Sequence, residues 1–282
     1  MRFIDTHCHI IPGVDDGAPD EKTSLAMAQI AASDGIGTVV ATPHVVEGIY
    51  DGGDREERLR KLANGIKREG IGLSLVAGVE VPMSMALGNS GLLSRLRLGS
   101  SRYLLLETTA TTFEQLSQAV YQTRLAGLFP VLAHPERAEF VAKDPGRLAR
   151  LIEGGDVFCQ ATVASLEGLF GKGPRKAALD MARSGLVHLV ASDAHSAGRR
   201  APRLSASFDL LASRVGEPAA RIIMLENPQR LIDDSPLASI ESGGASRKGL
   251  WSRPRPVHDA VYVQNSHDFA ADLNLPFQAD AL

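Results

Sequence analysis

The 282-residue chain has few of the features that mark several common classes of protein. Its two cysteines, Cys8 and Cys159, are too few for the disulfide framework of a small secreted domain. No apolar run approaches the roughly 20 residues that span a bilayer. The N-terminus also lacks the basic region, apolar segment and small-residue cleavage site of a signal peptide. We therefore expect a soluble, cytoplasmic protein that does not insert into a membrane.

A surplus of charge of one sign is also missing, because the formal net charge is −3 at pH 7. This balance offers no bulk electrostatic attraction to nucleic acid or to an anionic membrane. Residues 1–230 contain no basic stripe with interleaved aromatic side chains. The sequence therefore predicts no nucleic-acid partner.

What the chain does contain is a hydrophobic content of 44%, which is enough for a substantial core. Strand-like and helix-like stretches alternate up to about residue 230. Several strand-like stretches are apolar without alternation, as parallel strands buried on both faces are. The pattern predicts an α/β fold, either a parallel βα barrel or a doubly wound sheet. The predicted strands are Phe3–Cys8, Gly37–Thr42, Leu73–Glu80, Tyr103–Thr108, Pro130–His134, Asp156–Thr162 and Val187–Ser192. The predicted helices are Asp20–Ser33, Asp54–Glu69, Thr112–Ala126, Pro145–Glu153, Pro174–Ser184 and Pro202–Val215.

The character of the sequence changes near residue 235. Residues 242–246 read Ser-Gly-Gly-Ala-Ser, which is a linker composition, and basic residues interleaved with prolines follow from Arg247 to Arg255. Residues 258–282 show only weak periodicity. We divide the chain into a domain at 1–234 and a linker with a loosely ordered tail at 235–282.

Side chains that bind metals follow almost every predicted strand. In a parallel α/β fold the carboxyl ends of the strands meet at one face, and that face holds the active site. Only the strand that ends near Cys159 and Gln160 lacks such a residue. His188 lies inside a strand rather than at its end, so we assign it to packing. The residues at the strand ends are His7, His9, Asp15, Asp16, His44, Glu80, Glu107, His134, Glu136, Asp193 and His195.

This set predicts a metal site with more than one ion. His7 and His9 stand two residues apart on a strand, so both imidazoles point to the same face, and neutral imidazole is the commonest metal ligand. Mixed imidazole and carboxylate ligands suit Zn, Mn or Fe better than Ca or Mg alone. The candidate ligands outnumber those that one ion uses. Carboxylates in such a site bridge ions, and a shared water becomes a nucleophile at neutral pH.

These candidate ligands lie within short sequence motifs. The motifs are His7-x-His9, Ile10 to Gly17, Ala41-Thr42-Pro43-His44 with Gly48 and Tyr50, Gly78-x-Glu80, His134-Pro135-Glu136-Arg137, Gln160 with Ser165, Gly168 and Phe170-Gly171, and Ser192-Asp193-x-His195. As a set they resemble the PHP (polymerase and histidinol phosphatase) superfamily. More narrowly, they resemble the bacterial manganese-dependent tyrosine phosphatases that act beside capsule and exopolysaccharide tyrosine kinases. The resemblance extends from residue 1 to about 230 and leaves the tail uncovered.

The resemblance implies a distorted parallel (β/α)7 TIM-like barrel with a trinuclear site, for which Mn²⁺ is the expected metal and Fe or Zn are the alternatives. It also implies that Asp16, rather than Asp15, is both a ligand and a catalytic residue. Arg137 matches a phosphate-contacting arginine, and Arg199 matches a second one, with Arg200 as the alternative at that position. The implied ligands are His7, His9, Glu80 and Asp193 for the first ion, Glu80, Glu107 and His134 for the second, and Asp16, His44 and His195 for the third.

The implied activity is the hydrolysis of phosphotyrosine on a protein, expected to be a membrane-associated bacterial tyrosine kinase that controls capsule or exopolysaccharide synthesis. Neither Cys8 nor Cys159 begins a Cys-x5-Arg loop, so a cysteine nucleophile is not predicted. Two alternatives stay open. One is a PHP phosphoesterase for a small ester such as histidinol phosphate, which would share every ligand. The other is a non-catalytic barrel, either a regulator that binds a kinase or a polymerase-type PHP module, which would be expected to have lost ligands.

Overall fold

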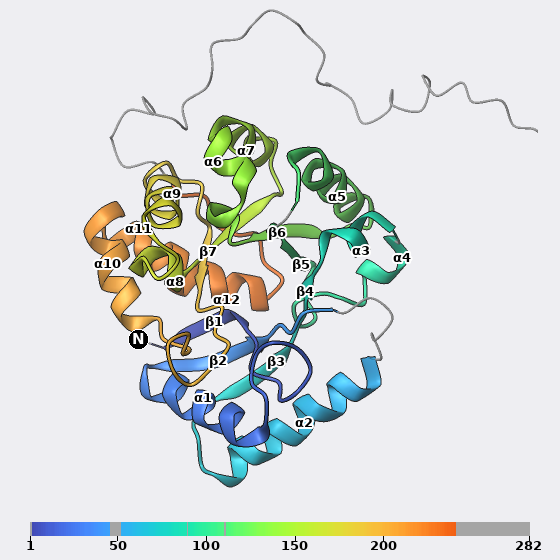
Figure 1. Ribbon diagram of the computed structural model, residues 1–282, viewed down its shortest axis with the longest axis vertical. Coiled ribbons are helices and arrows are strands. Elements are labelled where there is room, and N and C mark those ends of the chain that lie inside the picture. Colours follow the sequence, from blue (N-terminus) through green and yellow to red (C-terminus); the bar gives the residue numbers. More distant parts are fainter. Residues whose placement is uncertain (1, 46–51, 89, 110, 241–282) are drawn as a thin grey trace, which may run out of the picture. The chain divides into compact units, whose positions relative to one another are not determined.

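All strand pairs in the described part of the chain are parallel, and the strands form two sheets (Figure 1). The structure is a computed structural model and describes residues 2–45, 52–88, 90–109 and 111–240. One sheet has the order β1-β2-β3 and the other has the order β4-β5-β6-β7-β8. The strands are β1 (Phe3–Cys8), β2 (Ile36–Ala41), β3 (Ser74–Ala77), β4 (Glu80–Val81), β5 (Tyr103–Glu107), β6 (Phe129–Ala133), β7 (Phe158–Thr162) and β8 (Leu189–Ala191).

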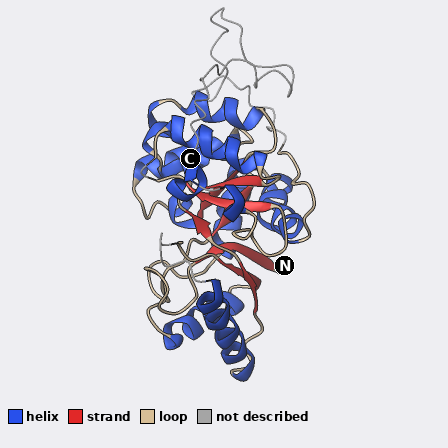
Figure 2. Cartoon of the chain, turned by 90° about the vertical axis from the view of Figure 1, so that its right-hand side faces the viewer, coloured by secondary structure: helices blue, strands red, loops and turns tan. Residues whose placement is uncertain are grey.

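Helices follow the strands along the chain and cover the outer faces of the sheets (Figures 1 and 2). Every predicted helical stretch contains a helix, so the predicted mixed α/β fold with parallel sheets is confirmed. The longer helices are α1 (Glu21–Ser33), α2 (Gly52–Arg68), α5 (Phe113–Leu125), α7 (Pro145–Glu153), α9 (Lys172–Arg183) and α10 (Ser205–Val215). The shorter ones are α3 (Met83–Gly88), α4 (Ser90–Leu93), η1 (Pro135–Arg137), α6 (Glu139–Lys143), α8 (Val163–Glu167), α11 (Glu217–Arg221), η2 (Ile222–Glu226) and α12 (Asn227–Ile232).

Capping side chains determine where two of these helices begin. The carboxylate of Asp20 accepts a hydrogen bond from the amide of Thr23 at 2.7 Å, at the start of α1. At the start of α5, Thr112 and Gln115 form a reciprocal capping box. Such caps satisfy amide groups that have no partner within the helix. They therefore fix the residues at which α1 and α5 begin.

The predicted strand Leu73–Glu80 is in fact two strands, which is a correction to the sequence analysis. β3 ends at Ala77, and β4 begins at Glu80 in the other sheet. At Gly78 the backbone passes so close to β2 that a Cβ atom would lie 2.8 Å from the Val40 side chain. This close approach lets the chain leave one sheet and enter the other. Apolar patterning records burial but not this change of partner, so the sequence predicted one strand.

Hydrogen bonds join the two sheets at both ends. Beside β1, the amide of Asp193 donates to the carbonyl of His7 and the amide of His9 donates to the carbonyl of Ala194, each at 2.9 Å. At the other junction, the amide of Val45 donates to the carbonyl of Glu80 at 3.3 Å. A buried apolar cluster draws on strands of both sheets and on α12: Val40, Leu98, Tyr103, Leu105, Val131, Ala133, Leu189 and Leu231. The sheets therefore share one interior, and their carboxyl ends lie at one face.

No helix in the described residues is long and apolar enough to cross a bilayer.

Residues 235–240 contact the rest of the fold: the side chain of Asn227 accepts a hydrogen bond from the amide of Ala238 at 2.7 Å and donates to its carbonyl at 3.0 Å. The rest of the predicted linker and tail, residues 241–282, lies outside the described residues, as do Gly48 and Tyr50.

Candidate metal centre

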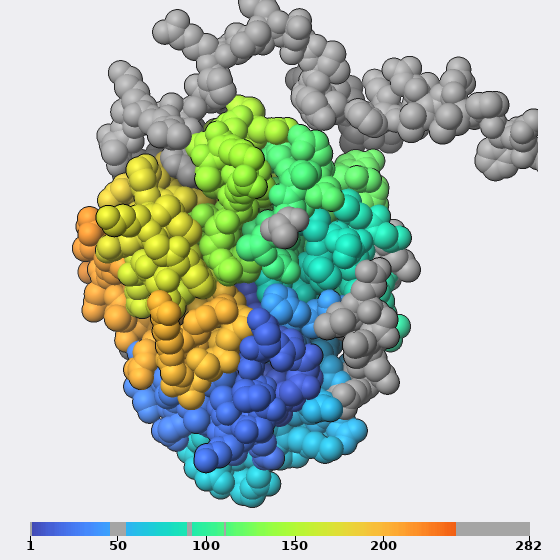
Figure 3. All heavy atoms as spheres, viewed as in Figure 1, coloured from blue at the N-terminus to red at the C-terminus, as the bar shows by residue number. Residues whose placement is uncertain are grey.

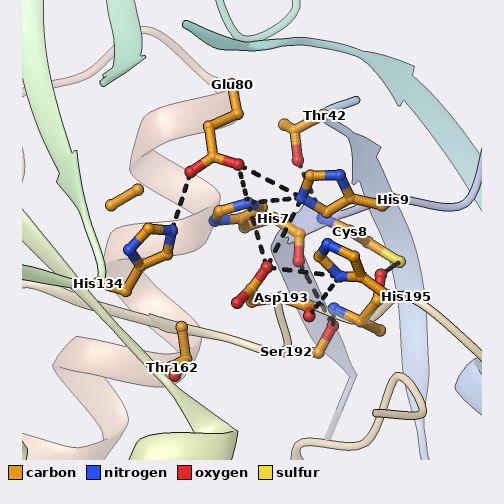
Figure 4. Close-up of polar contacts among 12 residues, drawn as sticks. His7, Cys8, His9, Thr42, Glu80, His134, Thr162, Ser192, Asp193 and His195 are labelled. Atoms are coloured by element: carbon orange, nitrogen blue, oxygen red, sulfur yellow. Dashed lines mark hydrogen bonds and ion pairs between the residues drawn. The ribbon is translucent and has the colours of Figure 1, made fainter. Parts of the chain in front are cut away.

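The carboxyl ends of the strands and the loops that follow them bring all nine predicted ligands together. Figure 4 shows six of them: His7, His9, Glu80, His134, Asp193 and His195. They form four overlapping groups, within each of which the ligand atoms lie within 4.8 Å of one another. The groups are His9, Asp16, His44 and His195; His7, His9 and Asp193; His7, Glu80 and His134; and His44, Glu80 and Glu107. Because His7, His9, His44 and Glu80 each belong to more than one group, the four groups make a single continuous cluster.

Glu80 occupies the middle of this cluster. Its Oε2 lies 3.2 Å from Nε2 of His7 and 3.2 Å from Nδ1 of His44, while its Oε1 lies 2.9 Å from Nε2 of His134. The two oxygens of this carboxylate thus face different histidines. The geometry follows from the break between β3 and β4, because β4 begins at Glu80. A carboxylate placed in this way is suited to bridging two ions.

Asp193 faces His7 and His9 from the side opposite Glu80 (Figure 4). Its Oδ1 is 3.6 Å from ring nitrogens of His7, His9 and His195. Asp193 and His134 both have positive φ, at 51° and 38°. Residues other than glycine adopt this conformation at a cost, and such positions gather at functional sites. The backbone strain at the ends of β6 and β8 therefore directs two ligands into the cluster.

The cluster opens to solvent on the side of Asp16. Nε2 of His195 lies 3.4 Å from Asp16 Oδ1, and Nε2 of His44 lies 3.7 Å from the same oxygen. The Asp16 side chain is 67% exposed, and that of Glu107 is 27% exposed, whereas His7 and His9 are fully buried. A substrate therefore approaches the cluster from the side on which Asp16 and Glu107 lie.

Asp15 and Gln160 support the ligands from behind. Asp15 Oδ2 lies 2.7 Å from Nδ1 of His9 and accepts a hydrogen bond from the amide of His44 at 2.9 Å. Gln160, on β7, accepts a hydrogen bond from Nδ1 of His7. Partners of this kind hold a metal-binding imidazole in one orientation and one tautomer. The sequence analysis counted Asp15 among the candidate metal-binding residues and gave Gln160 no role in the site, although the position of Gln160 at a strand end was a usable signal.

The electrostatics of the cluster require positive charge inside it. Burial alone would raise the pKa of Glu80, but the charge of His7 and hydrogen bonds from the surrounding histidines lower it well below its usual range. Burial would lower the pKa of His9, but Asp15 and Glu80 raise it to about 10. Buried carboxylates are stable as anions only beside cations. Imidazolium protons or divalent ions can supply that charge, so the donor set fits divalent metal ions.

Two arginines border the cluster at Asp193. Arg200 donates from Nη2 to Asp193 Oδ2 at 2.7 Å, and Arg137 donates from Nη1 to the same oxygen at 3.4 Å. Their guanidinium carbons lie 5.6 Å and 4.3 Å from the ring centroid of Phe170. Both side chains remain about a quarter exposed, at 26% and 28%. Arg200 therefore lies at the edge of the metal-ligand cluster, whereas the side chain of Arg199, which the sequence analysis preferred, is exposed.

Comparison with known proteins agrees with this geometry. The family described as capsular polysaccharide synthesis, CpsB/CapC, matches residues 3–233. The chain belongs to this family. Tyrosine-protein phosphatase YwqE of Bacillus subtilis (strain 168) is 36% identical over 205 residues, which cover 70% of this chain and 79% of YwqE. Tyrosine-protein phosphatase CpsB of Streptococcus pneumoniae is 28% identical over 243 residues, which cover 82% of this chain and 99% of CpsB.

Solved structures extend the comparison. A chain from the crystal structures of YwqE and CpsB, described as unique metal-dependent tyrosine phosphatases, matches this CpsB/CapC family member with a TM-score of 0.76 at 31% identity. The match covers 84% of this chain and 97% of that chain. A D-hydantoinase matches with a TM-score of 0.51 at 13% identity over 79% of this chain and 68% of that chain, which is a likeness of fold alone.

Proposed function

We propose that this CpsB/CapC family member is a metal-dependent protein-tyrosine phosphatase. The observation that carries the proposal is the cluster itself: nine imidazole and carboxylate ligands and two guanidinium groups gather at one open face. The named relatives support the same activity. The cysteines offer no competing nucleophile, because Cys8 and Cys159 are buried and burial raises the pKa of each thiol well above its usual range.

The metal ligands and the two arginines would have different roles in hydrolysis. Divalent ions held by the nine ligands would supply Lewis acidity and a water molecule activated for attack on phosphorus. Arg137 and Arg200 take the phosphoryl oxygens, because planar guanidinium groups match phosphate geometry with paired hydrogen bonds. Asp16 completes the outermost ligand group, where the phosphate enters. A tyrosine phenolate leaves with a pKa near 10, so the leaving group needs little help from a proton donor.

We propose that the cluster holds three ions, with Mn²⁺ as the native metal and Fe or Zn as alternatives that ligand chemistry also allows. His7, His9, Glu80 and Asp193 would hold one ion, Glu80, Glu107 and His134 a second, and Asp16, His44 and His195 a third. We propose further that the two joined sheets amount to a distorted (β/α)7 barrel within residues 1–234. Hydrogen bonds at both junctions between the sheets support this description.

We propose that the substrate is a phosphorylated tyrosine kinase at the cytoplasmic membrane, one that controls capsule or exopolysaccharide synthesis, and that the phosphatase acts on it in the cytoplasm. The family description, which concerns capsular polysaccharide synthesis, and the named phosphatase relatives support this choice. In this proposal the substrate is therefore a phosphotyrosine side chain of a protein and not a small phosphate ester such as histidinol phosphate.

Phosphate release by the purified protein tests the function. A phosphotyrosine peptide, a phosphoserine peptide and histidinol phosphate are compared after chelation and again after Mn²⁺, Zn²⁺ or Mg²⁺ is restored. The matched variants are His134→Ala, which removes a ligand that faces Glu80 at 2.9 Å, and His188→Gln, which changes a buried histidine outside the cluster.

We expect turnover to be highest on the phosphotyrosine peptide, to require metal, and to be lost in His134→Ala but kept in His188→Gln. Activity confined to histidinol phosphate would contradict the protein-phosphatase function while leaving the metal centre intact. Unchanged activity of His134→Ala, with its circular dichroism spectrum also unchanged, would contradict the metal mechanism.

A further inference from the structure

A basic groove lies on the surface between α9 and α10, apart from the metal ligands. Its volume is about 420 Å³. The two helices lie side by side, α9 in yellow and α10 in orange, in Figures 1 and 3. The groove is lined by Lys172, Arg175, Lys176, Leu179, Asp180, Arg183 and Arg214.

The charge of this groove is strongly positive. Five of its lining residues are basic and exposed, and only Asp180 is acidic. Asp180 pairs with Lys176 at 2.6 Å and with Arg183 at 3.2 Å, so the one carboxylate is already shared between two cations. Among the described residues, no ion pair is formed by Lys172 or Arg214. The chain as a whole has a net charge of −3, so overall composition does not explain this concentration of cations.

The groove begins next to the proposed phosphate site. α9 starts at Lys172, two residues after Phe170, whose ring lies against the guanidinium of Arg137. α9 also packs against η1, the turn that carries Arg137. Arg175 links the start of α9 to α8 across this loop, because its Nε donates to the carbonyl of Leu166 in α8 at 3.2 Å. The short loop that carries Phe170 thus lies between the basic groove and the two arginines proposed to bind phosphate.

We propose that this groove binds an acidic segment of the phosphoprotein substrate next to the phosphotyrosine, an inference that rests on the proposed phosphatase function. The acidic groups would be carboxylates or further phosphates. α9 has 12 residues and so a length of about 18 Å. An extended peptide covers that length with about five residues. The acidic groups recognised by the groove therefore lie within about five residues of the phosphotyrosine.

A peptide fits this groove better than a membrane surface does. The groove is concave, and its exposed walls are mostly apolar, formed by Leu179 and by the side-chain stems of the basic residues. The long stems of lysine and arginine also cover apolar surface while their charged ends face the solvent. A strand of peptide can enter such a groove with its acidic side chains against the cations. The plane of lipid headgroups at a membrane meets a flat or convex surface instead.

Steady-state kinetics of the full chain with Mn²⁺ test the proposal. Two phosphotyrosine peptides are compared, one with glutamate and one with serine at the five positions on each side, and p-nitrophenyl phosphate serves as the small substrate. The groove variant is Lys172→Glu/Arg214→Glu. The matched control is Lys22→Glu/Lys67→Glu, which makes the same change of charge at exposed positions on α1 and α2.

For the groove variant, we expect KM for the glutamate peptide to rise about tenfold, with kcat unchanged. KM for the serine peptide and all rates on p-nitrophenyl phosphate should stay at the wild-type values. In the wild type, added salt should remove most of the preference for the glutamate peptide. The control variant should behave as the wild type does.

Equal KM values of the groove variant and the wild type for the glutamate peptide would overturn the proposal, and so would an equal rise for the serine peptide. Vesicles with anionic lipid provide the remaining comparison. If the groove variant loses binding to these vesicles while its peptide kinetics stay unchanged, the groove is a membrane contact and the peptide proposal is wrong. Absence of wild-type turnover on every phosphotyrosine substrate would instead overturn the phosphatase function.

Discussion

Gln160 accepts a hydrogen bond from His7, with 2.9 Å between Gln160 Oε1 and His7 Nδ1. The amide nitrogen of Gln160 donates to Thr6 Oγ1, also at 2.9 Å, so the oxygen faces His7. An amide oxygen can only accept, which places the proton of His7 on Nδ1. Nε2 of His7, 3.2 Å from Oε2 of Glu80, is then the nitrogen that faces the cluster and would bind an ion. Gln160 is on β7, the strand for which the sequence analysis predicted no residue in the site.

Replacement of Gln160 by leucine should weaken metal binding about 10- to 100-fold, since such supporting partners contribute that much to ligand basicity and orientation. Gln160→Glu keeps an acceptor for Nδ1 and should retain most of the affinity. Titration of the metal-free protein with Mn²⁺, followed by phosphate release, measures both variants. Wild-type metal affinity in Gln160→Leu would show that the hydrogen bond does not position His7.

The two adjacent arginines should differ sharply in their effect on activity. Arg200→Lys removes the planar fork that reaches Asp193 and should lower kcat/KM by about a hundredfold. Arg199→Lys, at an exposed position, should change kcat/KM by less than about twofold. Kinetics on a phosphotyrosine peptide separate the two variants. The reverse order would restore Arg199 as the phosphate-binding residue that the sequence analysis assigned.

Removal of metal should lower the melting temperature of the protein. A ligand present at about a thousand times its Kd stabilises the folded state by about 4 kcal/mol. For a domain of this size that corresponds to a decrease of the order of 10 °C on chelation. Differential scanning fluorimetry with chelator, and again with excess Mn²⁺, measures the shift. Arg200→Lys keeps every ligand and should show the same shift, and a melting temperature independent of metal would contradict the centre.

His188 should make stability depend on pH. Burial lowers its pKa to about 4, although a backbone hydrogen bond opposes the shift. The unfolded chain therefore takes up a proton near pH 6.5 that the folded chain refuses until about pH 4. Its contribution is complete above pH 6.5 and falls by about 3 kcal/mol as the pH decreases to 4.

His188→Gln removes this titration but keeps an acceptor for the amide of Cys159, which lies 3.2 Å from Nδ1 of His188. Urea unfolding at pH 7.5, 6 and 5, with equal metal, should show a smaller loss of stability on acidification in the variant than in the wild type. Parallel curves for the two proteins would mean that His188 is not held in its neutral form.

The sequence predicted most of the strands and the imidazole and carboxylate side chains that gather at their carboxyl ends, because both depend on local signals. Buried parallel strands are apolar, and the residue that follows each strand reaches the same face whatever the details of packing. His134 and Asp193 could be chosen in this way without any knowledge of their neighbours. The assignment of His188 to packing agrees with its burial at 7% exposure, but its predicted position inside a strand is wrong, because β8 begins one residue later, at Leu189.

What the sequence could not predict depends on contacts between distant residues. The choice between Asp15 and Asp16 is made by the turn after β1, which directs Asp15 beneath His9 and leaves Asp16 exposed. Likewise, Arg200 reaches Asp193 because the loop folds back, with the amide of His195 donating to the carbonyl of Arg200 at 3.0 Å. Spacing along the chain contains none of this information.

Because β3 and β4 belong to different sheets, bound ions would also stabilise the contact between the two sheets. His7, His9 and His44 belong to the first sheet and its loops, whereas Glu80, His134 and Asp193 belong to the second. An ion bound by ligands from both sheets would link the two sheets at their carboxyl ends. Amide hydrogens at the junctions, such as those of His9 and Asp193, should then exchange with solvent more slowly in the loaded protein. Metal supply would thereby set how often the fold opens locally, as well as how fast it turns over substrate.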